Sequence, residues 1–162
     1  MIKIGVIGLG YVGLTFSIVA AKNNLKVYGI EKNNKILDLI SNGYAPFYEK
    51  GLSSILNSLL NKNFFVDKKF NKNQDLDCFL ITVGTPINKQ TKKPEIETII
   101  NALDSISDIY TGSELVVLRS TVSVGITKKI VIPKLMEMSG LSATQVKVVF
   151  APERTTEGNA IF

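Results

Sequence analysis

The stretch IKIGVIGLGYVG, residues 2–13, decides the fold of this chain. Its first half, residues 2–7, is short, largely apolar and β-branched, and is followed by glycines, which predicts a buried β-strand. The periodicity that follows predicts a helix over residues 11–22. We expect the inner face of that helix to carry Val12, Phe16, Val19 and Ala20.

Between the predicted strand and helix lie Gly8, Gly10 and Gly13, spaced as G-x-G-x-x-G. In a strand-to-helix turn the first glycine permits the tight bend and the second lets a pyrophosphate approach the backbone. The third allows the helix to pack closely on the sheet. The positive end of the helix then faces the phosphates. The pattern predicts a dinucleotide-binding site.

An acidic residue, Glu31, follows a second predicted strand, residues 26–30, and lies 18 residues after Gly13. A carboxylate at this point accepts hydrogen bonds from the adenosine ribose hydroxyls and repels the 2′-phosphate of NADP, so NAD is favoured. Lys32 and Lys35 follow closely. Either could attract a phosphate, or both could be solvated lysines at the start of a helix.

The rest of the chain alternates apolar strands with amphipathic helices. Further strands are predicted at residues 64–66, 78–83, 115–118 and 146–150, and further helices around residues 36–40, 52–60, 96–106 and 126–138. This order predicts an α/β, Rossmann-like doubly wound fold with a mainly parallel six-stranded sheet and helices on both faces. We expect residues 1–162 to form one domain.

Composition excludes several kinds of site. The 162 residues include one cysteine and no histidine or tryptophan. A disulfide framework, a Cys/His zinc site, a Ser-His-Asp triad and a histidine general base are therefore excluded. Cys78 is predicted to lie in the middle of a buried strand, where a thiol is unreactive.

The net charge of +5 comes from 19 basic and 14 acidic residues, and all but two of the basic residues are lysines. They are scattered and never more than two in a row, so we expect no nucleic-acid partner. The first residues do not form a signal peptide or a membrane span. A lone cysteine without an export signal indicates the cytoplasm.

Three more polar segments follow predicted strands, at residues 83–86, 119–122 and 151–157. The carboxyl ends of parallel strands form the ligand crevice, so these loops should converge there. Thr85 and Thr121 are candidate site residues, or else a turn residue and a helix cap. Glu153 and Glu157 could share a helical face as an acid/base pair, or be solvated charges.

The ordered motifs resemble the amino-terminal domain of the UDP-glucose/GDP-mannose dehydrogenase family. They are IGLGYVG at 7–13, the acid at Glu31, VGTP at 83–86, RSTVSVG at 119–125 and APERTTEG at 151–158. The resemblance implies an enzyme that oxidises the C6 alcohol of a nucleotide sugar to a carboxylate. Such an enzyme uses two NAD and passes through an aldehyde and a cysteine-bound thioester.

The same resemblance implies roles for individual residues. The NAD contacts would be Gly8, Gly10, Tyr11, Val12, Gly13, Glu31, Gly84, Thr85, Thr121 and Glu157. Thr121 would also help hold a catalytic water. Glu153 would be a substrate-side carboxylate, and Glu157 would lie beside the nicotinamide and the reacting centre.

The family's nucleophilic cysteine, catalytic lysine and asparagine, central helix and nucleotide-sugar domain have no counterpart within residues 1–162. We therefore expect a truncated chain that binds NAD without completing the oxidation, taken from a family whose full-length members are commonly homodimers. Arg154 after Pro-Glu resembles the UDP-N-acetylhexosamine branch. Two alternatives are a stand-alone, non-catalytic NAD-binding module and the Rossmann half of a 3-hydroxyacid-type dehydrogenase.

Overall fold

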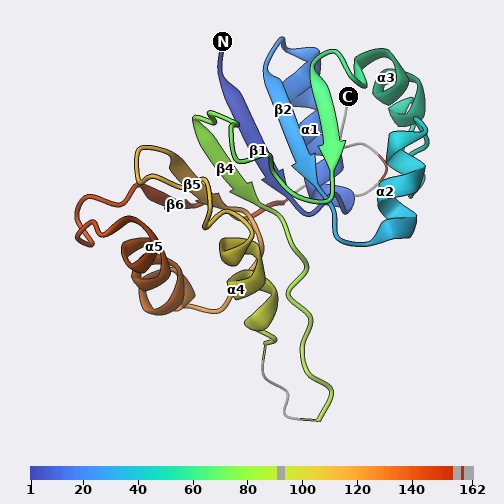
Figure 1. Cartoon of the computed structure of the whole chain (residues 1–162). Coiled ribbons are helices and arrows are strands. Elements are labelled where there is room, and N and C mark those ends of the chain that lie inside the picture. The colour runs from blue at the N-terminus through green and yellow to red at the C-terminus, as the bar shows by residue number, and fades with distance from the viewer. Residues whose placement is uncertain (91–93, 155–157, 159–162) are drawn as a thin grey trace.

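A single sheet of six parallel strands runs through the computed structural model, which describes residues 1–90, 94–154 and 158. The strand order is β3-β2-β1-β4-β5-β6 (Figure 1). The strands are β1 Lys3–Ile7, β2 Lys26–Ile30, β3 Phe64–Asp67, β4 Cys78–Ile81, β5 Leu115–Leu118 and β6 Val148–Phe150. The α/β, Rossmann-like prediction is confirmed, and every pairing is parallel rather than mainly so.

The helices fall between the strands as the periodicity predicts. They are α1 Tyr11–Lys22, α2 Asn34–Ser41, α3 Leu52–Leu59, α4 Glu97–Asp104 and α5 Ile132–Ser139. A π-helical turn, η1 Thr127–Val131, directly precedes α5. Pro133 follows that turn and cannot donate a backbone hydrogen bond, so the helix predicted over residues 126–138 changes its hydrogen-bonding pattern here.

Apolar residues fill both faces of the sheet. Ile4 and Val6 of β1 pack with α1 and α3 in one core cluster. Ile7 faces the opposite cluster, which includes side chains of α4 and α5. Since successive residues of a strand point to opposite faces, burial on both faces explains why these strands are continuously apolar.

Helix α1 presents a different face from the one expected. Of the predicted inner residues only Ala20 is buried, and Val19 is 37% exposed. The buried set is Gly13, Leu14, Thr15, Ser17, Ile18, Ala20 and Ala21. A Cβ at position 13 would lie 1.9 Å from the Gly8 carbonyl oxygen. Gly13 therefore has to face the glycine turn, and this close approach sets the rotation of the helix.

Cys78 begins β4 rather than lying in its middle, and its side chain is half-buried. Burial, and next the negative charge of Asp77, raise the pKa of this thiol to about 11. The Cys78 thiol is still expected to be unreactive at the start of the strand, because a thiol with that pKa carries very little thiolate near neutral pH.

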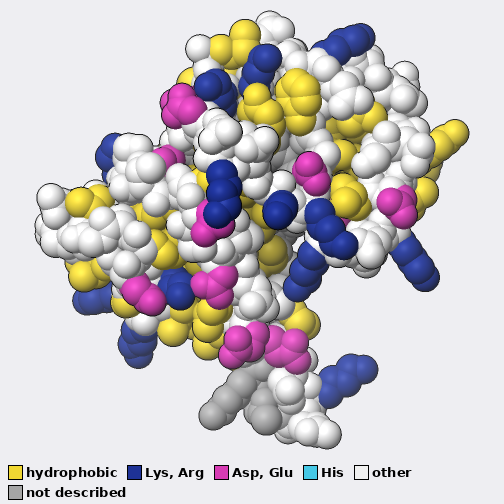
Figure 2. Space-filling model, in the orientation of Figure 1, with side chains coloured by type: hydrophobic (Ala, Val, Ile, Leu, Met, Phe, Trp, Pro, Cys, Tyr) yellow, Lys and Arg dark blue, Asp and Glu magenta, His cyan; other side chains and the backbone are white. Residues whose placement is uncertain are grey.

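Within the described part of the chain, no helix combines the length and the apolarity needed to cross a membrane. Lysine and arginine side chains are spread over the face visible in Figure 2 and are interleaved with acidic ones.

Candidate functional site

A cavity of about 370 Å³ opens at the carboxyl ends of β1, β2 and β4. Its volume falls within the range of about 300–1,000 Å³ typical of small-molecule pockets. Its walls come from the glycine turn, the ends of the strands and one face of α4. The lining includes Gly8, Gly10, Glu31, Lys32, Lys68, Thr82, Gly84, Thr98, Asn101 and Ser105.

Different features of the structure explain why glycine stands at each position of the G-x-G-x-x-G turn. Gly8 has φ +91°, a conformation that favours glycine. Gly13 leaves no room for a side chain between α1 and the turn. Gly10, by contrast, has an ordinary φ of −68°, and a Cβ there would meet nothing within 4 Å. The first and third glycines are thus required by the fold, whereas the second leaves space beside the start of α1.

Gly84 repeats the pattern of Gly10 on the neighbouring strand end. A Cβ at this position would also meet nothing within 4 Å, and Gly84 lines the same cavity. Gly10 and Gly84 therefore border one cavity, and at neither position does packing within the protein exclude a side chain.

Glu31 lines the cavity and is only 8% exposed. Its Oε2 accepts a hydrogen bond from the Leu9 backbone N–H at 2.8 Å, and its Oε1 accepts one from Asn33 N–H at 2.8 Å. The carboxylate therefore braces the glycine turn. Because each carboxylate oxygen has two lone pairs, both oxygens still have capacity for ligand hydroxyls.

Lysines border the acidic end of the cavity. Lys32 lines it, whereas Lys35 is not among its lining residues, and the Lys35 N–H donates to the Asn33 side chain. Lys68 also lines the cavity. Sequence reasoning missed Lys68, although it directly follows β3 and thus lies at the same edge of the sheet.

Thr82 is a second residue that sequence reasoning missed. Its hydroxyl lies 2.9 Å from the carbonyl oxygen of Ile7 and 2.7 Å from that of Gly8, and can donate to either. It therefore links the end of β4 to the glycine turn. The only signal in the sequence is that Thr82 is the one hydroxyl residue within the apolar strand predicted at residues 78–83.

Thr85 and Thr121, predicted from separate loops, are in direct contact. The Thr85 hydroxyl donates to the Thr121 carbonyl oxygen at 2.6 Å. Ser120 reinforces this link by donating to the Val83 carbonyl oxygen, also at 2.6 Å. Thr121 itself is exposed and does not cap a helix, since Ile126 caps the η1 turn. The capping alternative for Thr121 is wrong.

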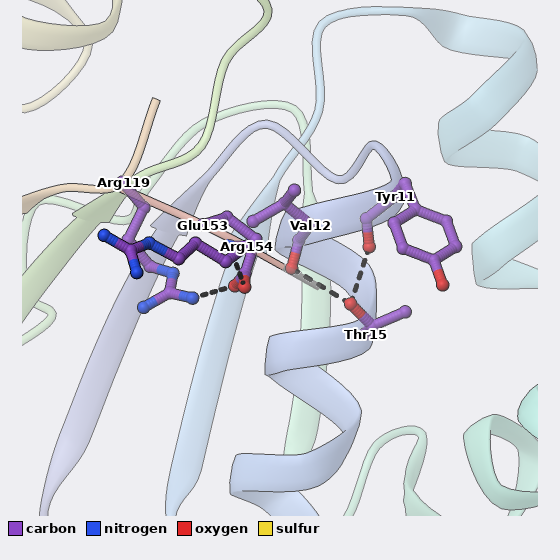
Figure 3. A network of polar contacts seen from close by, with 6 residues as sticks. All are labelled: Tyr11, Val12, Thr15, Arg119, Glu153 and Arg154. Carbon is purple, nitrogen blue, oxygen red and sulfur yellow. Dashed lines mark hydrogen bonds and ion pairs between the residues drawn. The ribbon is translucent and has the colours of Figure 1, made fainter. Parts of the chain in front are cut away.

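Glu153 forms an ion pair with Arg119, and both side chains are about one-fifth exposed. The Arg119 guanidinium also lies over the Phe16 ring of α1, with 5.9 Å between the guanidinium carbon and the ring centroid. Figure 3 shows Arg119 and Glu153 with the ion pair that joins them. Glu153 is therefore not a solvated charge. Glu157, the other predicted carboxylate, lies outside the described residues.

Tyr11 is not among the residues that line the cavity. Its hydroxyl donates to Glu49 Oε2 at 2.7 Å, and its ring centroid lies 5.0 Å from that of Phe47. Sequence reasoning missed Glu49, since no periodicity marks a glutamate in the loop at residues 44–51.

No group of three or more candidate metal ligands occurs among the described residues. The cavity and the loops beside it combine a glycine turn, a braced carboxylate, two lysines and two linked hydroxyl-bearing loops at one edge of a parallel sheet. Such an edge is where open α/β sheets bind nucleotides.

Comparison with known proteins gives one consistent family. Residues 2–162 match the family model described as UDP-glucose/GDP-mannose dehydrogenase family, NAD binding domain. UDP-N-acetyl-D-mannosamine dehydrogenase of Campylobacter jejuni is 31% identical over 98% of this chain and 40% of its own length. UDP-N-acetyl-D-glucosamine 6-dehydrogenase of Salmonella typhi is 31% identical over 98% of this chain and 36% of its own.

Solved structures agree. The UDP-N-acetyl-mannosamine dehydrogenase of Staphylococcus aureus superposes with a TM-score of 0.86 at 30% identity, covering 96% of this chain and 38% of its own. A GDP-mannose dehydrogenase from Pseudomonas aeruginosa gives 0.87 at 30% identity, covering 98% and 37%. The chain thus spans well under half the length of these relatives, and similar identities to enzymes of different sugars do not separate the substrates.

Proposed function

The chain belongs to the UDP-glucose/GDP-mannose dehydrogenase family, and from that premise we propose that it binds NAD as part of a nucleotide-sugar 6-dehydrogenase. The family assignment overturns the alternative of a 3-hydroxyacid-type dehydrogenase. The stand-alone, non-catalytic NAD-binding module remains the competing proposal. The coding region that follows residue 162 separates the two, since only the enzyme requires a cysteine-bearing second part.

The main support for NAD binding comes from two glycines, Gly10 and Gly84, that the fold itself does not require. Gly8 and Gly13 are accounted for by backbone conformation and packing, but Gly10 and Gly84 are not. Both border the cavity, and Gly10 directly precedes α1. Space beside the N-terminus of a helix fits a pyrophosphate, which hydrogen-bonds to backbone N–H groups and is favoured by the helix dipole.

At the other end of the cavity, Glu31 would accept hydrogen bonds from the adenosine ribose. Its two backbone partners fix the carboxylate in place before any ligand binds. A 2′-phosphate would lie next to this negative charge, so we propose a preference for NAD over NADP. Lys32 and Lys68 border the same region and would reduce, without reversing, that preference.

Bound NAD would supply the two-electron acceptor for oxidation of the sugar C6 carbon. We propose that Thr121 helps to hold a catalytic water, that Glu153 lies on the substrate side, and that Glu157 lies near the reacting carbon. The link between Thr85 and Thr121 and the ion pair between Arg119 and Glu153 would hold these groups in position. The nucleophile and the sugar-binding residues would come from a part of the enzyme outside residues 1–162.

The nature of the sugar is a further part of the proposal. The resemblance of Arg154 after Pro-Glu to the UDP-N-acetylhexosamine branch favours a UDP-N-acetylhexosamine as the substrate. We further propose a cytoplasmic enzyme that acts as a homodimer when full length.

The test is calorimetric titration of the purified chain with NAD, NADP and ADP. Gly10→Ala should retain the melting temperature, because the added methyl meets nothing within 4 Å, yet weaken NAD binding at least about tenfold by obstructing the pyrophosphate. Gly84→Ala is the matched second substitution. Failure of the unmodified chain to bind NAD, or unchanged binding by Gly10→Ala, would contradict the proposal.

A further inference from the structure

Three segments that are far apart in the sequence meet at Glu49. The Tyr11 hydroxyl, at the start of α1, lies 2.7 Å from Glu49 Oε2. The backbone N–H of Gly158 points to the same oxygen at 2.9 Å and to the Tyr11 hydroxyl oxygen at 3.0 Å. Gly158 is 109 residues from Glu49 and 147 from Tyr11. The cluster therefore ties the end of the APERTTEG motif to the glycine-turn helix.

Glu49 is unusually buried for a glutamate, at 5% exposed. Removing a carboxylate from water costs free energy unless hydrogen bonds replace the lost hydration. Tyr11 and Gly158 provide two of the donors, and hydrogen bonds to a charged acceptor are stronger than neutral ones. The burial of Glu49 is thus tied to contacts with two other segments rather than to its own loop alone.

Two described residues of the APERTTEG motif contact distant parts of the chain. Glu153 pairs with Arg119, which lies over Phe16 of α1. Gly158 donates to Glu49 and Tyr11. Both attachments lead to α1, the helix whose N-terminus borders the cavity.

We propose that Glu49 is a positioning residue, which with Tyr11 anchors Gly158, and thereby the end of the APERTTEG segment, to the NAD-binding helix. The inference rests on the proposed function, because it assigns that segment to the nicotinamide half of NAD. Loss of the anchor should therefore weaken NAD binding and leave ADP, which lacks the nicotinamide half, unaffected.

The experiment compares Tyr11→Phe and Glu49→Gln with the unmodified chain. Tyr48→Phe and Glu137→Gln serve as matched controls, since both side chains are largely exposed. NMR hydrogen exchange at the Gly158 amide reports the anchor, and calorimetry gives the dissociation constants of NAD and ADP. Both test variants should accelerate Gly158 exchange and raise the NAD dissociation constant about three- to tenfold, with ADP within about twofold.

A double substitution sharpens the result. If the two side chains act as one unit, Tyr11→Phe combined with Glu49→Gln should change NAD affinity no more than either alone. A merely structural role would lower the melting temperature and weaken NAD and ADP alike. Should Glu49→Gln fail to fold, Tyr11→Phe, which removes only one hydroxyl oxygen, decides the question.

Unchanged Gly158 exchange, or an unchanged ratio of NAD to ADP affinity in the folded variants, overturns the proposal. If the unmodified chain binds neither nucleotide, the proposed NAD-binding function fails and this positioning role in it fails with it. If the unmodified chain binds NAD but Tyr11→Phe and Glu49→Gln behave like the two control variants, the positioning role is wrong and the NAD-binding function stands.

Discussion

The two halves of the site are built differently. In the β1–α1–β2 half, Leu9 and Glu31 are joined across 22 residues, and Glu31 both braces the turn and lines the cavity. In the β4–β6 half, hydroxyl and charged side chains link loops, as Thr85 does with Thr121 across 36 residues. Folding and binding therefore share residues in the first half and are more nearly separable in the second.

Substitution of Gly13 should cause the largest loss of stability, because this residue lies in the half of the site where folding and binding use the same residues. Gly13→Ala would place a methyl 1.9 Å from the Gly8 carbonyl oxygen, which backbone atoms cannot accommodate without moving. We expect a loss of about 3 kcal/mol or more in unfolding free energy. Denaturant unfolding followed by circular dichroism measures it, with Gly10→Ala as the control. Equal stability of the two variants would contradict the distinction drawn between these glycines.

Substitution of Glu31 should lower both the unfolding free energy of the chain and its affinity for NAD. Glu31→Ala leaves the backbone N–H groups of Leu9 and Asn33 without their carboxylate, at a cost of about 2 kcal/mol. Unfolding and NAD titration should both detect the change. Glu31→Gln, which keeps the shape and one acceptor oxygen, should lose less stability than Glu31→Ala. If Glu31→Ala alters affinity alone, the carboxylate does not brace the turn.

Arg119 and Glu153 test whether the second half contains its own structural pair. Because the two side chains are about one-fifth exposed, Arg119→Ala should lower the unfolding free energy by about 1–2 kcal/mol. A double-mutant cycle with Glu153→Gln isolates the interaction. Additive losses would show that the two charges do not stabilise one another.

Thr121 should give the smallest effect on stability. Its side chain is exposed and caps no helix, so Thr121→Ala should change the unfolding free energy by less than about 0.5 kcal/mol. Thr85→Val, which removes the donor to the Thr121 carbonyl, should cost about 1 kcal/mol. Thermal unfolding of the two variants shows which of them is less stable. A drop of several degrees for Thr121→Ala would restore a structural role for that hydroxyl.

Much of the fold was predictable because it rests on local rules. Short, largely apolar runs predicted all six strands, and the spacing of glycines predicted the α1 turn. Glu31 was predictable for the same reason, since it directly follows β2. The inner face of α1 was not predictable from periodicity, because that helix is apolar on nearly every side and close approach decided its rotation.

The sequence by itself therefore determined the order of strands and helices, the glycine turn, Glu31 and the meeting of the strand-end loops at one edge of the sheet. Only the tertiary structure decided that Thr82 bonds the turn, that Lys68 borders the cavity, that Arg119 pairs with Glu153 and that Glu49 meets Tyr11 and Gly158. The physical reason is the distance along the sequence over which each interaction acts. Backbone conformation and strand burial act over a few residues, whereas these contacts depend on how closely segments tens of residues apart approach in the packed chain.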